Sequence, residues 1–130
     1  MTLSDRKERS RTQMVKAVFP NTTNHYDTLF GGTALQWMDE TAFITATRFS
    51  RQKMVTVSSE RIDFTESIPA GKLVELTGEV SHVGNTSLTV IVTMVIEDMY
   101  SEKCSEAIKG KFNMVAIDDD RKPTPISVGC

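Results

Sequence analysis

Hydrophobic and polar positions divide the chain into one segment with the period of a helix and five segments with the character of strands. Apolar, β-branched and aromatic residues become frequent from Thr12 to Phe19, and Pro20 then ends the segment, which predicts a first strand. The second half of the chain alternates between apolar and polar residues and is interrupted by turn residues such as Gly84-Asn85. This alternation predicts four more strands: Met54–Phe64, Lys72–Val83, Thr86–Asp98 and Cys104–Asp118.

A helix is predicted from about Thr33 to Phe49. Apolar residues cover nearly every face of this helix: Ala34, Leu35, Trp37, Met38, Ala42, Phe43, Ile44, Ala46 and Phe49. A helix that is apolar on all sides is normally buried. The element order therefore predicts an α+β hotdog fold, in which a five-stranded antiparallel sheet wraps around one long central helix. Such a fold leaves a sheet edge and part of the helix uncovered, which predicts that the chain dimerises.

Length and composition are those of one globular domain. The chain has 130 residues, of which 39% are hydrophobic and 25% are charged. We expect residues 1–11 to be a polar, frayed N-terminal leader, residues 12–126 to form the domain, and residues 127–130 to be a C-terminal tail. The net charge of -2 disfavours nucleic-acid binding, which usually needs a concentrated basic face. No apolar run approaches the roughly 20 residues that span a bilayer, so we expect no membrane partner.

The cysteines and the N-terminal residues indicate in which cellular compartment the protein is found. The first residues lack the apolar core of a signal peptide, which argues against secretion. Cys104 and Cys130 are the two cysteines of the chain, and we interpret them as free thiols in a reducing environment, with a disulfide as the less favoured alternative. The sequence therefore predicts a cytoplasmic protein.

Asp39 is the most informative residue of the predicted helix. It lies on the row Leu35–Asp39–Phe43 with further apolar residues beside it, so we expect its carboxylate to face apolar neighbours. An unpaired buried carboxylate costs several kcal/mol. Asp39 is therefore either satisfied by a salt bridge or cap elsewhere in the fold, or it serves as a general base or nucleophile in a cleft at a subunit interface. Glu40 points about 100° away and is interpreted as a solvated or interface charge.

Gly31 and Gly32 stand at the start of the same helix. Glycine destabilises a helix by about 1 kcal/mol relative to alanine, so a pair at this place needs a reason. One interpretation is that the missing side chains let a ligand approach the backbone, where free N–H groups and the positive end of the helix dipole stabilise a developing oxyanion. The alternative is a tight turn into the helix or close packing against a sheet.

Two polar residues outside the helix are candidates for the same site. Asn24 lies in the loop before the glycines, where its amide could orient a water molecule or a substrate carbonyl. The commoner alternative is an Asx-type hydrogen bond within the loop. Thr56 lies near the start of the second predicted strand. His25 has no visible partner, and we interpret it as a surface residue.

Motifs of several other enzyme classes are not found. The two histidines and two cysteines have no metal-ligand spacing, so no metal is expected. The sequence has no phosphate-binding loop with Gly-Lys-Ser/Thr, no dinucleotide fingerprint and no Gly-x-Ser-x-Gly elbow. The helix carboxylate therefore remains the main candidate for chemistry.

Taken together, these residues resemble the acyl-CoA thioesterases of the hotdog superfamily, in the branch of bacterial acyl-CoA hydrolases related to the animal cytosolic enzymes. The resemblance covers about residues 12–126. It begins with the run from Asn24 to Gly32 and with Trp37-Met38-Asp39-Glu40. It continues through Val55-Thr56-Val57, Asp63-Phe64, Val83-Gly84-Asn85-Thr86-Ser87 and Met114-Val115-Ala116-Ile117-Asp118.

This resemblance implies an activity and a site. It implies hydrolysis of acyl-CoA to a fatty acid and coenzyme A, without metal or cofactor, by a homodimer that assembles into a hexamer as a trimer of dimers. Asp39 would be the catalytic carboxylate, and Asn24 and Thr56 would complete the site, with the aspartate and asparagine coming from facing subunits. We expect Gly32 or Gly31 to donate its N–H to the substrate carbonyl. The segments that contact coenzyme A would be Val57, Ser58, Ser59, Thr86, Ser87 and Leu88.

Two features depart from the family pattern. Asp27 stands where relatives usually have glycine in a loop with positive φ, a conformation that aspartate tolerates better than most residues. Relatives also commonly continue into a basic C-terminal helix that holds the nucleotide end of coenzyme A. We therefore expect other cations to contact the phosphates, and the candidates are Arg61, Lys109, Lys111 and Lys122.

Two other functions remain open at this point. One is a non-catalytic acyl-CoA-binding hotdog module. The less favoured one is a hotdog hydratase or dehydratase, which would need a histidine beside the helix carboxylate, and His25 is the only candidate. The acyl-chain length is also open, because Trp37, Met38 and Phe43 are better explained by core packing than by lining a tunnel.

Overall fold

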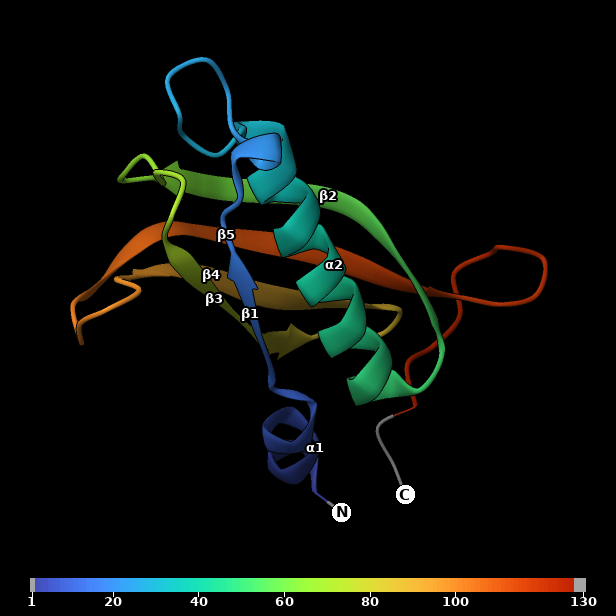
Figure 1. The fold of residues 1–130 in the computed structure, drawn as a ribbon. Coiled ribbons are helices and arrows are strands. Elements are labelled where there is room, and N and C mark those ends of the chain that lie inside the picture. The colour runs from blue at the N-terminus through green and yellow to red at the C-terminus, as the bar shows by residue number, and fades with distance from the viewer. Residues whose placement is uncertain (1, 128–130) are drawn as a thin grey trace.

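One antiparallel sheet and one long helix make up most of the molecule. The structure is a computed structural model that describes residues 2–127. Helix α2 lies across one face of the sheet, and helix α1 lies beside the C-terminal end of α2 (Figure 1). The elements are α1 (Leu3–Ser10), β1 (Thr12–Ala17), a 3-10 turn (Pro20–Thr22), α2 (Gly31–Ser50), β2 (Lys53–Phe64), β3 (Leu73–Val83), β4 (Ser87–Glu97) and β5 (Cys104–Ile117).

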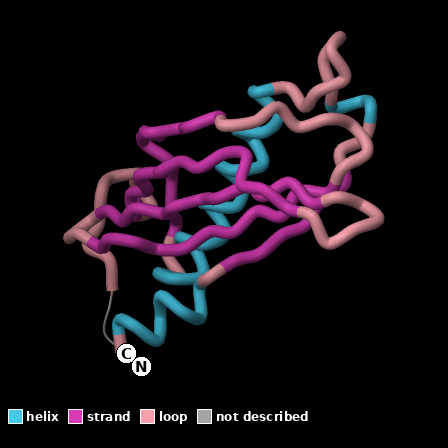
Figure 2. The backbone as a smooth tube through the Cα atoms, turned by 90° about the vertical axis from the view of Figure 1, so that its left-hand side faces the viewer, coloured by secondary structure: helices cyan, strands magenta, loops and turns pink. Residues whose placement is uncertain are grey.

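All five predicted strands and the predicted helix are present, with ends that differ by at most two residues. The strand order in the sheet is β1-β3-β4-β5-β2, and every neighbouring pair is antiparallel. Strand β2 therefore pairs with β5 instead of with β3, which follows it in the chain. The two sheet edges are β1 and β2. In Figure 2 the strands (magenta) run across the long helix (cyan). This α+β architecture is the hotdog fold.

The core lies between the inner face of the sheet and one face of α2. Alternate residues of β4 are buried along its whole length, as expected of a strand covered on one face. Gly78 of β3 lies so near the helix that a Cβ atom there would collide with the hydroxyl of Thr45. That hydroxyl donates a 2.7 Å hydrogen bond to the carbonyl of Thr41 and cannot easily move away. The glycine therefore lets helix and sheet approach closely, and the buried residues of α2 are Ala34, Met38, Thr41, Ala42, Thr45, Ala46, Phe49 and Ser50.

Part of α2 is uncovered in the single chain, as expected of a hotdog fold with one sheet. Met38 is fully buried and Trp37 packs against the core, as predicted, but the same prediction is wrong for Phe43, which is exposed. Leu35 and Phe43, on the side away from the sheet, are 36% and 48% exposed. A single five-stranded sheet covers only one side of the helix, so the other apolar side is open.

The expectation of a frayed leader is also wrong. Residues 3–10 form α1, whose first turn is closed by reciprocal hydrogen bonds between Thr2 and Asp5. Arg6 ties this helix to the domain, because its guanidinium donates to the carbonyls of Phe49 and Ser127 at 2.6 Å each. Residues 128–130 of the predicted tail, with Cys130, lie outside the described residues, and Cys104 is an exposed free thiol.

Candidate active site

Asp39 lies on the open side of α2, at a groove between the helix and strand β2. The groove has a volume of about 630 Å³, and its lining residues are Asp39, Glu40, Phe43, Ile44, Val55 and Thr56. Asp39 itself is exposed in the chain, so the expected burial of its carboxylate among apolar neighbours is not found. The apolar neighbours on its row are present, but they belong to the uncovered side of the helix. Among residues 2–127, Asp39 makes no salt bridge.

Thr56 reaches the carboxylate from the neighbouring strand. It is paired with Met114 of β5, which is buried, so its side chain points to the helix side of the sheet. The Thr56 hydroxyl donates a 2.7 Å hydrogen bond to Oδ1 of Asp39 and lies 3.2 Å from Sδ of Met114. The fold therefore brings together two of the residues that the sequence singled out, although they are far apart in the chain.

A bulge follows Thr56 in the edge strand. The pairing with β5 shifts between Thr56 and Ser58, and the bulge places Ser58 opposite Asn113. Asn113 donates a 2.9 Å hydrogen bond to the hydroxyl of Ser58, on the outer face of the sheet. Thr56 and Ser58 thus point to opposite faces, although an unbroken strand would place them on the same one. Val57, Ser58 and Ser59 are all exposed.

Gly31 and Gly32 are the first two residues of α2. Phe30, which precedes them, provides no side-chain cap for the helix. Within residues 2–127, neither glycine N–H has a recorded hydrogen-bond acceptor. A Cβ atom added to either glycine would meet nothing within 4 Å, so close packing does not explain them. Within residues 2–127, the helix therefore begins with N–H groups that have no acceptor, at the positive end of its dipole, and the space where the Cβ atoms would stand is open.

Asn24 organises the loop that leads into the helix. Its Oδ1 accepts hydrogen bonds from the N–H groups of Tyr26 and Thr28, at 2.9 and 3.3 Å, and from the Thr28 hydroxyl at 3.1 Å. The Asx-type turn that the sequence left open is therefore present. The Nδ2 group of Asn24 has no recorded acceptor within residues 2–127. Asp27 has φ 60, so this loop does use the left-handed conformation at that position.

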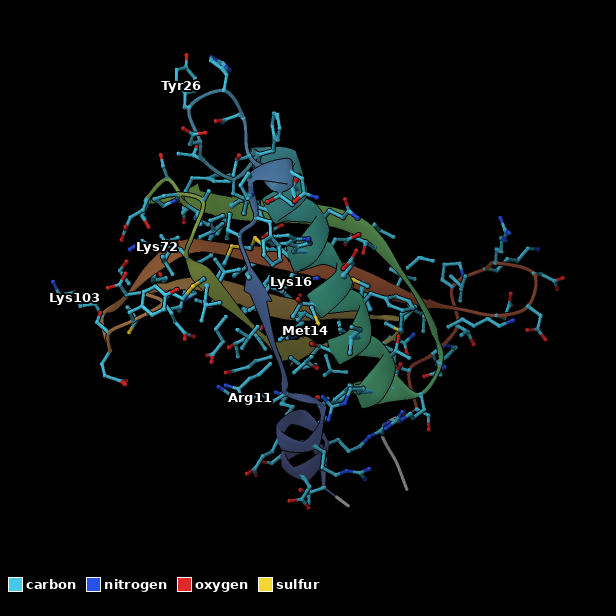
Figure 3. The ribbon with its side chains drawn as sticks, viewed as in Figure 1. Arg11, Met14, Lys16, Tyr26, Lys72 and Lys103 are labelled. Atoms are coloured by element: carbon cyan, nitrogen blue, oxygen red, sulfur yellow. The ribbon has the colours of Figure 1, made fainter. Side chains whose placement is uncertain are left out.

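The loop extends away from the body of the molecule, with Tyr26 at its tip (Figure 3). The ring of His25 lies 3.9 Å from the ring of Tyr26. Neither Asn24 nor the two glycines belong to the lining of the Asp39 groove, as far as residues 2–127 define it. One chain thus brings Asp39 and Thr56 together, and it holds Asn24 and the glycines at a separate place near the start of the helix.

The turn between β3 and β4 contains the other predicted coenzyme-binding residues. The carbonyl of Thr86 accepts a 2.9 Å hydrogen bond from the N–H of Ala116, and the carbonyl of Ser87 accepts one of 2.7 Å from Gly84. The side chains of Thr86 and Ser87 are partly exposed. Leu88 is 1% exposed and belongs to the core, so a ligand could meet only its main chain.

Within residues 2–127, no group of three or more His, Cys, Asp or Glu side chains is placed to hold a metal ion. The helices in that same range lack the length and apolar character needed to cross a membrane.

The hotdog fold carries an acid–threonine pair on the open side of its helix. N–H groups without an acceptor within residues 2–127 lie at the start of the same helix. Together these features define a hotdog hydrolase. The model of the thioesterase superfamily matches residues 26–103, and the chain belongs to this superfamily. The uncharacterized acyl-CoA thioester hydrolase YkhA of Bacillus subtilis is 33% identical over 117 residues, which cover 90% of this chain and 68% of that protein.

Solved structures agree with this assignment. The acyl-CoA hydrolase of Staphylococcus aureus, in complex with butyryl coenzyme A, coenzyme A and coenzyme A disulfide, is 34% identical with a TM-score of 0.89, and the match covers 94% of this chain and 74% of that one. An apo-hexameric acyl-CoA thioesterase is 37% identical, also with a TM-score of 0.89, and the match covers 92% and 77% of the two chains.

Three single variants of the Staphylococcus aureus enzyme also match. They replace one asparagine, one aspartate and one threonine by alanine. In that enzyme the aspartate follows the asparagine by 15 residues, and the threonine follows the aspartate by 17. Asn24, Asp39 and Thr56 have the same two spacings in this chain.

Proposed function

We propose that this protein hydrolyses acyl-CoA thioesters to a free fatty acid and coenzyme A, and that Asp39 is the catalytic carboxylate. The observation that carries the proposal is the hydrogen bond from Thr56 to Asp39 at the edge of an open groove. The names of the relatives and the butyryl coenzyme A complex of the Staphylococcus aureus enzyme support the substrate class. The shared spacing of its three variant positions supports the choice of Asn24, Asp39 and Thr56.

The complete site is formed by two copies of the chain. One copy supplies Asp39 and Thr56, and the facing copy supplies Asn24 and the N–H groups of Gly31 and Gly32. The open side of α2 and the unpaired edge of β2 are the surfaces that need a cover. Their exposed apolar residues are Leu35, Phe43, Val55 and Val57. We propose a homodimer that assembles further into a trimer of dimers, and the hexameric relatives support this assembly.

Hydrolysis follows from this arrangement. Asp39 takes a proton from a water molecule, and the water oxygen attacks the thioester carbonyl carbon. The resulting oxyanion accepts a hydrogen bond from the N–H of Gly32. One such hydrogen bond typically raises the rate about 10²–10³-fold. The C–S bond then breaks, and the coenzyme A thiolate leaves with the proton that Asp39 had taken. Direct attack by Asp39 through an anhydride is the alternative, and in both routes the Nδ2 group of Asn24 orients the water or the carbonyl.

The coenzyme A moiety contacts the segments that the resemblance to acyl-CoA thioesterases implies. We assign it contacts with Gly31, Val57, Ser58, Ser59, Thr86, Ser87 and the main chain of Leu88. The candidates for its phosphates are Arg61, Lys109, Lys111 and Lys122. The reaction as proposed needs no metal or cofactor, and we place the protein in the cytoplasm.

Release of free thiol from a panel of acyl-CoA substrates tests the activity. The proposal predicts release well above spontaneous hydrolysis for at least one chain length. Binding of acyl-CoA without any release would contradict it and would favour the non-catalytic binding module.

Subunit complementation tests the shared site. Asn24→Ala and Asp39→Ala should each be nearly inactive alone. When the two variants are co-expressed, half of a random mixture of dimers contains one intact site, so about a quarter of wild-type activity should return. No recovery in heterodimers that are shown to form would contradict the two-chain site.

A further inference from the structure

Asn113 lies at the centre of a group of hydrogen-bonded side chains on the outer face of the sheet. Its Oδ1 accepts a 3.1 Å hydrogen bond from the hydroxyl of Thr89 on β4. Its Nδ2 donates to the hydroxyl of Ser58 at 2.9 Å and to a carboxylate oxygen of Glu60 at 3.3 Å, both on β2. These four side chains form an outer-face network that joins three neighbouring strands, β4, β5 and β2.

The two β2 members of the outer-face network come directly after the bulge. Val57 is the extra residue, because the pairing with β5 shifts between Thr56 and Ser58. In an unbroken strand Thr56, Ser58 and Glu60 would share one face. A strand without the bulge would therefore turn Thr56 away from the helix, or turn Ser58 and Glu60 toward it. The bulge allows Thr56 to reach Asp39 while the outer-face network keeps its contacts.

Burial anchors β2 only near its two ends. β2 is an edge strand with a neighbouring strand on one side. Met54 is buried, and Ile62 packs against the core with its side chain close to Gly110. Residues 55–61, between these two anchors, are all exposed. The register of an exposed strand is weakly specified by burial, so the hydrogen bonds of the outer-face network are what hold the bulge in place.

We infer that Asn113 is a positioning residue for the reaction. It holds Ser58 and Glu60 on the outer face and so fixes the bulge. The bulge in turn directs the Thr56 hydroxyl to Asp39. The inference rests on the proposed function, because Asp39 is the group that acts on the substrate. Asn113 lies on the other face of the sheet and acts only through Thr56, so its loss can lower kcat no further than loss of the Thr56 hydroxyl, about tenfold.

An exchange of amide and carboxylate within the outer-face network tests the inference. Asn113→Asp keeps acceptors for the hydroxyls of Thr89 and Ser58 but places a second carboxylate against Glu60. Two carboxylates in contact repel each other, so kcat should fall about three- to tenfold, with a smaller change in KM. Glu60→Gln keeps an acceptor oxygen for Asn113 and should stay close to the wild type. Combining Asn113→Asp with Glu60→Gln restores one donor and one acceptor, and kcat should return close to the wild type.

The Thr56→Val background shows whether the outer-face network acts through Thr56. In that background Asn113→Asp should lower kcat no further, because the hydroxyl that the bulge directs is already absent. An equal loss in both backgrounds would overturn the inference, as would wild-type kcat in Asn113→Asp or no recovery in the exchanged pair. The oligomeric state of each variant is measured as well. A loss of activity that follows a loss of the oligomer would also overturn the inference, since the network would then serve the interface.

Hydrogen exchange of the β2 amides tests the outer-face network without turnover. The amides of residues 54–60 should exchange about three- to tenfold faster in Asn113→Asp than in the wild type, and should regain protection in the exchanged pair. Equal exchange in all variants would overturn the inference. Failure of the proposed function gives a different result: if neither the wild type nor any variant cleaves an acyl-CoA while exchange follows the expected pattern, the hydrolysis is rejected and the hold of Asn113 on the bulge is retained.

Discussion

The hydroxyl of Thr56 donates a 2.7 Å hydrogen bond to Oδ1 of Asp39, and so joins edge strand β2 to the open side of helix α2. A hydroxyl carries a single proton, so Thr56 cannot donate to a water molecule while it holds the carboxylate. Oδ2 of Asp39 has no recorded donor within residues 2–127. Oδ2 is therefore the oxygen that is free to act on water or on the substrate, while Thr56 fixes the orientation of the carboxylate.

Loss of the Thr56 hydroxyl should slow turnover without weakening binding. In Thr56→Val the carboxylate is free to rotate, so kcat should fall about tenfold, the scale of one hydrogen bond of about 1.4 kcal/mol. KM should change less than kcat. Steady-state thiol release measures both, and Thr56→Ser, which keeps the hydroxyl, should stay close to the wild type. Equal activity of the valine and serine variants would contradict this role.

Asn24→Asp separates the two roles of Asn24. An aspartate keeps the acceptor oxygen for Tyr26 and Thr28, so the loop and the melting temperature should be preserved. It lacks the Nδ2 donor, whose removal should lower kcat by about 10²-fold. Thermal unfolding and thiol release measure the two effects separately. A fully active Asn24→Asp would show that the residue serves the loop alone.

Gly32→Ala should make the protein more stable and less active. The position is helical, and an added Cβ meets nothing within 4 Å, so alanine should stabilise the helix by up to about 1 kcal/mol. The same methyl group would occupy the space through which the thioester reaches the N–H group, and kcat/KM should fall at least about tenfold. Thermal unfolding measures the effect on stability, and steady-state thiol release measures the effect on kcat/KM. Increased stability with unchanged activity would remove Gly32 from the site.

The ion pair between Lys72 and Asp98 should give a measurable pH dependence of stability. The hydrogen bond from Lys72 at 2.6 Å, followed by that from Ser101, holds the pKa of Asp98 below its ordinary value of 3.8. A carboxyl group with a lowered folded pKa stabilises the fold above its unfolded pKa, and this contribution is lost as pH falls through the folded pKa.

The wild type should therefore lose more stability than Asp98→Asn as pH falls from about 5 to about 2. Urea unfolding of both proteins across this range gives the difference directly. Parallel stability curves for the two proteins would contradict the contribution of this pair.

Periodicity was sufficient to predict the five strands and helix α2, but it could not predict which strands pair with each other. Strands such as β4 alternate buried and exposed residues, and that alternation is visible in the sequence. Nothing local shows that β2 pairs with β5, because the pairing depends on how the whole sheet curves around the helix. Helix α1 has no apolar periodicity, because most of its residues are charged, and only the Thr2–Asp5 spacing that caps it is a recognisable signal.

The surroundings of the candidate site were only partly predictable, and the roles of its residues stay a prediction. The sequence singled out Asp39, but an apolar row on a helix does not reveal whether the sheet or a second copy covers it. Asp39 consequently lies exposed in the single chain. The bulge after Thr56 was also invisible, because residues 55–61 are all exposed and show no buried–exposed alternation that a one-residue shift in pairing could interrupt.

Thiol release by Asp39→Asn, measured beside the wild type on the same acyl-CoA, tests whether Asp39 is the catalytic carboxylate. The amide has nearly the same shape as the carboxylate but cannot accept the proton from water or attack the carbonyl. Turnover should fall by at least about 10²-fold, while the melting temperature and the oligomeric state stay those of the wild type. Near-wild-type turnover by the folded variant would contradict the assignment of Asp39 as the catalytic carboxylate.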